Sequence, residues 1–178
     1  AAIIVACVTG HKFMSKNTSI KAALNAGAIG SLLAIMNTAS EVGYGNVISS
    51  LPGFMEVADA LLGVGQGMPL FNVAIMVNIL AGLTGSASGG LSIALDLFGN
   101  TFLAETAAVG IPPEVVHRIA AMASGGLDSL PHNGAVITTL AICGLTHREA
   151  YKDMFAITIL KVVVAFFAVF FYMATGIV

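Results

Sequence analysis

Short apolar segments separated by polar, glycine-rich clusters are the feature that most restricts the fold of this chain. One cluster is TGSASGG at residues 84–90, and the other is SGGLDSLPHNG at residues 124–134. The apolar stretches on either side of the first cluster, residues 69–83 and 91–103, would each extend about 20 to 22 Å as helices. The hydrocarbon core of a bilayer is about 30 Å thick. Neither stretch therefore crosses a membrane alone.

The composition indicates that a membrane surrounds these segments. Hydrophobic residues make up 57% of the 178 residues and charged residues only 9%, against about 25% charged residues in soluble domains. So few charged side chains cannot cover a water-soluble globule, whereas a bilayer hides apolar surface without them. The formal net charge of -2 also excludes the basic footprint of a nucleic-acid-binding protein. We expect an all-α integral membrane protein whose partner is the lipid bilayer and not nucleic acid.

Four other segments complete the expected organisation. Residues 154–176 form an uninterrupted apolar segment long enough to be the last transmembrane helix. Residues 20–36 carry small residues four positions apart, a spacing that lets helices approach closely in lipid. The segment FMEVADALLGV places Glu56 and Asp59 on one face and reads as a short interfacial helix. The first ten residues are too short to span a bilayer, so we expect residues 1–178 to be one transmembrane domain from the C-terminal portion of a longer protein.

Basic residues in the loops decide how residues 69–104 lie in the membrane. This segment is either a re-entrant hairpin or one long crossing with an unwound centre. Lys and Arg mark cytoplasmic loops, and they occur around residue 20 and after residue 145. Both loops must then lie on the cytoplasmic side, so the chain between them crosses the membrane an even number of times. This count is met only if residues 69–104 enter and leave by the outer face. We therefore expect a re-entrant hairpin. The basic residues are Lys12, Lys16, Lys21, Arg148 and Lys152.

Residues 112–146 repeat this design as a broken helix. Pro112 and Pro113 begin a helix, residues 124–134 interrupt it, and residues 135–145 continue it. Non-helical backbone at mid-membrane depth persists only where it is buried in protein or lines a cavity, and the amides that start a helix attract carboxylates. We predict that both clusters face one cavity that holds a small organic anion; the alternative is two ordinary surface loops. The predicted substrate-binding residues are Gly85, Ser86, Ser88, Gly89, Gly90, Ser124, Gly125, Ser129 and Asn133.

Three titratable residues near the breaks, Asp128, His132 and Glu41, are candidates for proton coupling. A carboxylate beside apolar helices, such as that of Asp128, either pairs with a cation or takes up protons. His132 titrates near neutral pH, and its alternative role is to cap a backbone group. Glu41 has the alternative of being solvated at the outer mouth, and Lys161 is placed to snorkel to the cytoplasmic interface. No cofactor and no metal pattern are indicated. These titratable groups make the proton the expected coupling ion, with Na⁺ left open.

Three sequence blocks resemble a known family of transporters. NTASEVGYGNVISSLPGF, GSASGGLSIAL and ASGGLDSLPHNGAVIT are similar to the C-terminal portion of the gluconate permease family of bacterial inner-membrane symporters. The last block most resembles the 3-hydroxybutyrate permease branch. The resemblance implies a multi-pass protein of the bacterial inner membrane with an ion-transporter-type fold of two inverted repeats, each with a hairpin and a broken helix. This chain would be the C-terminal repeat, with residues 84–90 as the hairpin tip and 124–133 as the broken-helix loop, and its partner would be the N-terminal half of the permease.

The polar breaks and the resemblance together predict a secondary active transporter and not an enzyme. It would import a small hydroxycarboxylate, of the gluconate or 3-hydroxybutyrate type, by proton symport with alternating access. Two alternatives are a passive organic-anion channel and an intramembrane hydrolase that uses Ser88 or Ser129 with His132 as its base. The sequence leaves the oligomeric state open, with a homodimer as one option.

Overall fold

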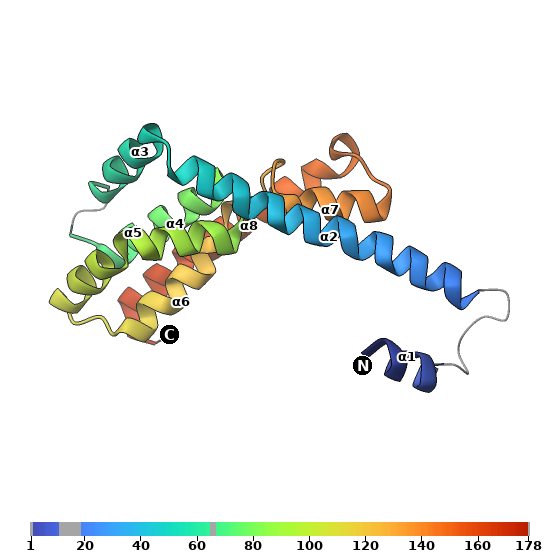
Figure 1. Ribbon diagram of the computed structural model, residues 1–178. Coiled ribbons are helices and arrows are strands. Elements are labelled where there is room, and N and C mark those ends of the chain that lie inside the picture. Colours follow the sequence, from blue (N-terminus) through green and yellow to red (C-terminus); the bar gives the residue numbers. More distant parts are fainter. Residues whose placement is uncertain (1, 11–18, 65–66, 178) are drawn as a thin grey trace. The chain divides into compact units, whose positions relative to one another are not determined.

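The computed structural model describes residues 2–10, 19–64 and 67–177, and every regular element in these ranges is helical. The chain divides into two compact units, Ala1–Met36 and Asn37–Val178. Of the basic residues used for the topology, Lys12 and Lys16 lie outside the described ranges. The elements are α1 (Ala2–Gly10), α2 (Ile20–Ser49), α3 (Pro52–Leu62), α4 (Pro69–Thr84), α5 (Ala87–Ala108), α6 (Pro113–Ser124), the 3-10 turn η2 (Leu127–Ser129), α7 (Gly134–Cys143) and α8 (His147–Thr175) (Figure 1). Of the described helices, α2 and α8 are long and apolar enough to cross a membrane, which is consistent with a membrane protein.

Helices α4 and α5 form a helical hairpin that turns at Gly85 and Ser86. Gly85 follows α4 in the left-handed region, at φ 66°, a conformation that glycine adopts without steric cost. Ser86 then caps α5, because its hydroxyl accepts a hydrogen bond from the Gly89 amide at 3.3 Å. The two helices pack against each other on either side of this turn.

The break at the hairpin tip is shorter than the sequence indicated. Helix α5 has 22 residues and extends about 33 Å, well beyond the 20 to 22 Å expected for this half of the hairpin. Residues 88–90, which we expected in an open tip, form its first turn. Gly90 lies against the backbone of Leu80 and Ala81, and a Cβ at this position would overlap both residues. The glycine therefore serves the close crossing of two helices.

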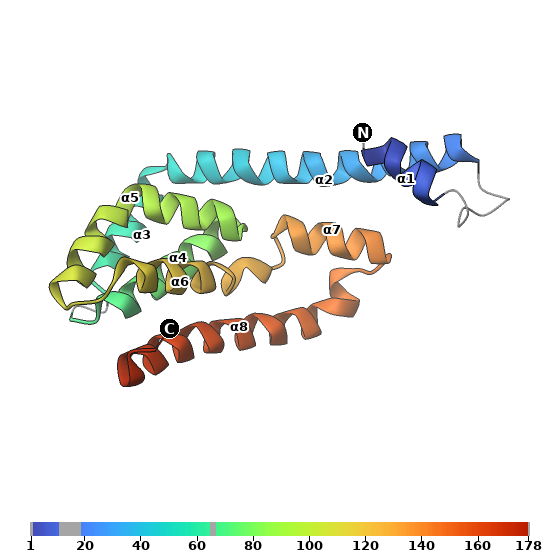
Figure 2. The ribbon, with the colours of Figure 1, turned by 90° about the horizontal axis from the view of Figure 1, so that it is seen from below.

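Helix α4 is the core of the Asn37–Val178 unit. It is buried on nearly every side, and α3, α5, α6, α8 and η2 all pack against it. Figure 2 shows α5 and α8 on opposite sides of α4 and α6. The rings of Phe71 in α4 and Phe166 in α8 have centroids 5.0 Å apart. A helix that is hydrophobic all round requires such a position, which explains the continuous apolar sequence of α4.

The structure interrupts the next helical segment between α6 and α7. Helix α6 ends at Ser124, η2 forms a single 3-10 turn, and Asn133 is the N-cap of α7. Pro131 lies between η2 and α7, and it cannot continue a helix because it lacks an amide proton. Helix α7 has only 10 residues and ends before Gly144, which is left-handed at φ 66°.

Helix α8 begins at His147, earlier than the start at Met154 that the apolar pattern predicted. Its first turn is fixed by a capping box, in which the Glu149 carboxylate accepts a hydrogen bond from the Thr146 amide at 2.8 Å. The polar residues before Met154 are thus the first turns of the last helix. A hydropathy pattern finds where a helix is apolar, whereas the cap determines where it starts.

Candidate functional site

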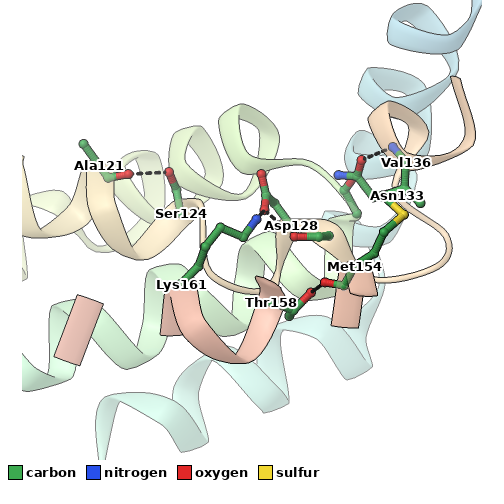
Figure 3. Close-up of polar contacts among 10 residues, drawn as sticks. Ala121, Ser124, Asp128, Asn133, Val136, Met154, Thr158 and Lys161 are labelled. Carbon is green, nitrogen blue, oxygen red and sulfur yellow. Dashed lines mark hydrogen bonds and ion pairs between the residues drawn. The ribbon is translucent and has the colours of Figure 1, made fainter. Parts of the chain in front are cut away.

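The loop between α6 and α7 binds the tip of the hairpin through two side chains. His132 Nε2 lies 2.9 Å from the Gly82 carbonyl oxygen, and Asn133 Nδ2 donates to the Gly85 carbonyl oxygen at 2.6 Å. Asn133 Oδ1 also accepts a hydrogen bond from the Val136 amide at 3.1 Å (Figure 3). The Asn133 side chain therefore joins the hairpin tip to the start of α7. Because carbonyls at the end of a helix lack intrahelical partners, the loop supplies donors that the tip needs.

Glu41 places a carboxylate at the start of α7. Its Oε1 accepts a hydrogen bond from the Gly134 amide at 2.5 Å. Gly134 is the first residue of α7, where the free amides and the helix dipole favour negative charge. A Cβ at Gly134 would overlap the Glu41 carboxylate and the Asn37 amide. The start of α7 is thus an anion position, and the chain's own carboxylate occupies it.

A cavity of about 290 Å³, lined mainly by residues that carry polar groups, lies beside this contact. Four of its lining residues come from α2, spaced so that they lie on one face of the helix. The others come from the end of α4, the broken-helix loop and the first turns of α7. The lining residues are Asn37, Ser40, Glu41, Tyr44, Thr84, His132, Gly134 and Ile137.

Asn37, Ser40 and Tyr44 were not among the predicted site residues. We expected an apolar segment over residues 20–36 with Glu41 near a break, whereas α2 continues without interruption to Ser49. With Glu41, these residues occupy positions i, i+3, i+4 and i+7, a polar stripe along a helix of otherwise small and apolar residues. Polar residues inside such a helix mark functional positions, so their helical spacing was the signal that could have identified them.

Asp128 and Lys161 form an ion pair between the broken-helix loop and α8 (Figure 3). Lys161 Nζ lies 2.5 Å from Asp128 Oδ1, which also accepts a hydrogen bond from the Ser129 hydroxyl at 3.3 Å. The structure thus presents the cation-pairing alternative for Asp128. The sequence did not indicate this partner for Lys161. The pair does not line the 290 Å³ cavity.

The other predicted serine and glycine residues make local contacts. The Ser124 hydroxyl donates to the Ala121 carbonyl at 2.9 Å (Figure 3), and Gly125 is the C-cap of α6. The Ser88 Oγ lies 3.5 Å from the Ser86 Oγ at the start of α5. None of the nine predicted substrate-binding residues, Asn133 included, lines the 290 Å³ cavity. The two clusters therefore meet through His132 and Asn133, while the cavity is completed by α2.

The contacts of His132 bear on the hydrolase alternative. Its Nε2 is bonded to the Gly82 carbonyl, and the Ser129 hydroxyl is bonded to Asp128. Within the described ranges, neither Ser88 nor Ser129 is hydrogen-bonded to His132. A serine nucleophile needs a base within hydrogen-bond reach, and this geometry does not provide that pair.

Asn78 of α4 is a buried amide that faces the break. It is 3% exposed, and neither its nitrogen nor its oxygen has a hydrogen-bond partner among the described residues. The amide lies against Gly126, where a Cβ would overlap it. An unpaired buried polar group costs about 1–3 kcal/mol. Packing, and not hydrogen bonding, therefore holds the break against α4 at this point.

Comparison with curated proteins places a transporter among the relatives of this chain. The chain is 46% identical over 179 residues to the uncharacterized transporter YxjC of Bacillus subtilis (strain 168). The alignment covers 99% of this chain and 38% of the relative, so the chain spans well under half the length of that protein. No family model matches the chain, and no solved structure matches it. The relative supports a transporter family for this chain.

Proposed function

We propose that this chain is part of a secondary active transporter that imports a small hydroxycarboxylate by proton symport with alternating access. The relative named as a transporter supports the class. Two helices of membrane-spanning length, together with a helical hairpin and an interrupted helix, support a multi-pass membrane protein. The gluconate or 3-hydroxybutyrate type of substrate rests on the resemblance of the sequence blocks at the two breaks.

One observation carries the proposal: the start of α7 holds a carboxylate at the edge of a cavity. The Gly134 amide donates to the Glu41 carboxylate at 2.5 Å. A substrate carboxylate has the same charge and geometry, so it would bind the same helix start. The cavity of about 290 Å³ is at the lower end of the range of about 300–1,000 Å³ for ligand pockets, which suits a small acid. Ser40 and Tyr44 on the α2 face would bind the hydroxyl groups of the substrate.

Charge neutrality supports coupling to a proton. Two negative charges 4 Å apart repel by about 4 kcal/mol at an effective dielectric constant of 20, so an anion beside an ionised Glu41 binds weakly. Glu41 and His132 line the cavity and are the candidates for the proton-carrying group. Asp128, the third candidate, is paired with Lys161, and the pair is already neutral. One proton taken up at the cavity would offset the charge of one monovalent anion.

Transport by the intact protein in proteoliposomes tests this function. Gluconate or 3-hydroxybutyrate added outside should accumulate against its gradient when the interior is alkaline, and the medium should become more alkaline as protons enter. Accumulation without any change in external pH would contradict proton coupling and direct the search to Na⁺. If the substrate enters but its internal concentration never exceeds the external concentration, the protein would instead be a passive channel.

A further inference from the structure

We infer that Glu41 is a tethered competitor of the substrate, which holds the substrate's carboxylate position until it takes up the coupling proton. This inference rests on the proposed function and assigns its coupling step to one residue. Glu41 reaches α7 from α2, across 93 positions of sequence. Its contact with Gly134 is therefore a feature of the tertiary structure and not a local cap.

The start of α7 is built around this carboxylate. Among its first amides, that of Val136 is used by the Asn133 side chain at 3.1 Å, and that of Gly134 is used by Glu41 at 2.5 Å. Gly134 is buried, and the absence of a Cβ leaves the space that the Glu41 carboxylate and the Asn37 amide fill. An anion that enters the cavity must compete with Glu41 for the Gly134 amide.

Protonation changes this competition in favour of the substrate. An ionised carboxylate makes a charge-assisted hydrogen bond to an amide, roughly twice as strong as a neutral one. A proton from the medium forms an O–H bond at one Glu41 oxygen, and no bond in the substrate forms or breaks. The neutral acid binds Gly134 less strongly, no longer repels an anion, and gains a donor that can bond a substrate oxygen. Release of the same proton on the other side would return Glu41 to Gly134 and expel the anion.

The other titratable groups that face Glu41 are His132, from the broken-helix loop, and Tyr44, on α2 itself. The lining residues from α4 and α7 are Thr84, Gly134 and Ile137, which do not titrate in the range of interest. The His132 Nε2 must carry a proton, because the Gly82 carbonyl to which it is bonded can only accept. Its Nδ1 is the competing proton site, so His132 needs its own variant in the test.

The test measures binding of 3-hydroxybutyrate and gluconate to the intact protein by calorimetry from about pH 5 to 8. The wild-type affinity should fall about tenfold per pH unit where Glu41 loses its proton, because one proton is bound with each anion. Glu41→Gln should bind with nearly constant affinity and exceed the wild type at least tenfold at the alkaline end. Glu56→Gln, in the exposed part of α3, is the matched control and should behave as the wild type.

Four outcomes overturn the inference. If Glu41→Gln retains the wild-type slope with pH, or if His132→Asn flattens it while Glu41→Gln does not, the inference fails and the proposed function stands. If the wild type binds neither acid at any pH, the proposed function fails and the inference fails with it. Infrared difference spectra of the wild-type protein give a readout that does not depend on the folding of a variant. Substrate should raise a protonated-carboxyl band, and its absence would also refute the assignment.

Discussion

The crossing of α4 and α5 at Gly90 allows a sharp test of the fold. In a Gly90→Ala variant the new Cβ would overlap Ala81 and lie 2.7 Å from the carbonyl carbon of Leu80, against an ordinary contact of about 3.4 Å. The hairpin must therefore open by roughly 0.7 Å at Leu80 alone, and by more at Ala81. Overpacking of this kind costs typically 1–3 kcal/mol. We expect the upper end of this range, because the overlapped atoms are backbone of a buried helix that cannot rotate away.

Gly99→Ala is the matched control, because Gly99 lies in the same helix and the nearest atom to its added Cβ is the Leu95 Cβ at 3.9 Å. Both variants gain the same helix propensity, about 1 kcal/mol for Ala over Gly, so the difference between them isolates the packing cost. Denaturant unfolding of the intact protein in detergent, followed by circular dichroism, should show Gly90→Ala about 2–3 kcal/mol less stable than Gly99→Ala. Equal stability of the two variants would refute the close crossing.

Three further predictions concern the break and its contacts. Asp128→Asn and Lys161→Met should each lower the free energy of unfolding by about 1–3 kcal/mol, because each change leaves one charge unpaired. The double variant should recover most of this loss. Additive losses in a double-mutant cycle would show that the pair does not interact. Asn133→Ala should cost about 2 kcal/mol, one for the cap of α7 and one for the bond to the hairpin, while Asn133→Asp should lose only the second part; equal losses would argue against the cap. Asn78→Leu should raise the midpoint of thermal unfolding, because it removes two unpaired buried polar atoms and keeps the branched shape of the side chain; a lower midpoint would mean that the amide has a partner.

The sequence predicted the elements of the fold better than their ends. The two interruptions were recognisable because glycine, proline and polar residues cannot be placed in lipid without a structural reason. The start of α5 was predicted too late, since a single residue, Ser86, caps a helix whose first turn is rich in glycine. The start of α8 was also predicted too late, since the Thr146–Glu149 box lies in a polar stretch. In each case a local hydrogen bond, which composition does not report, decided the boundary.

The partners of the site residues could not be read from the sequence. Glu41 was a candidate, but its contact with Gly134 depends on the tertiary structure of the Asn37–Val178 unit. Lys161 was assigned to an interface because its position along α8 allows snorkelling, whereas the proximity of Asp128 is a property of the packed unit. The polar residues on one face of α2 could be assigned to a site only after the folded chain showed that they line a cavity. A one-dimensional pattern identifies residues that need a partner, and tertiary structure selects the partner.

The shortness of α7 has a consequence for how such a protein is made. Its 10 residues extend about 15 Å, half of the hydrocarbon thickness of about 30 Å, and α4 with 16 residues also falls short. In the multi-pass protein proposed above, cellular machinery that inserts continuous apolar stretches one at a time would recognise α2 and α8. Helices α4 and α7 would enter the bilayer only by packing against neighbouring helices. Lesions in helix packing should then appear in cells as degradation of newly made chains, well before any effect on turnover can be measured.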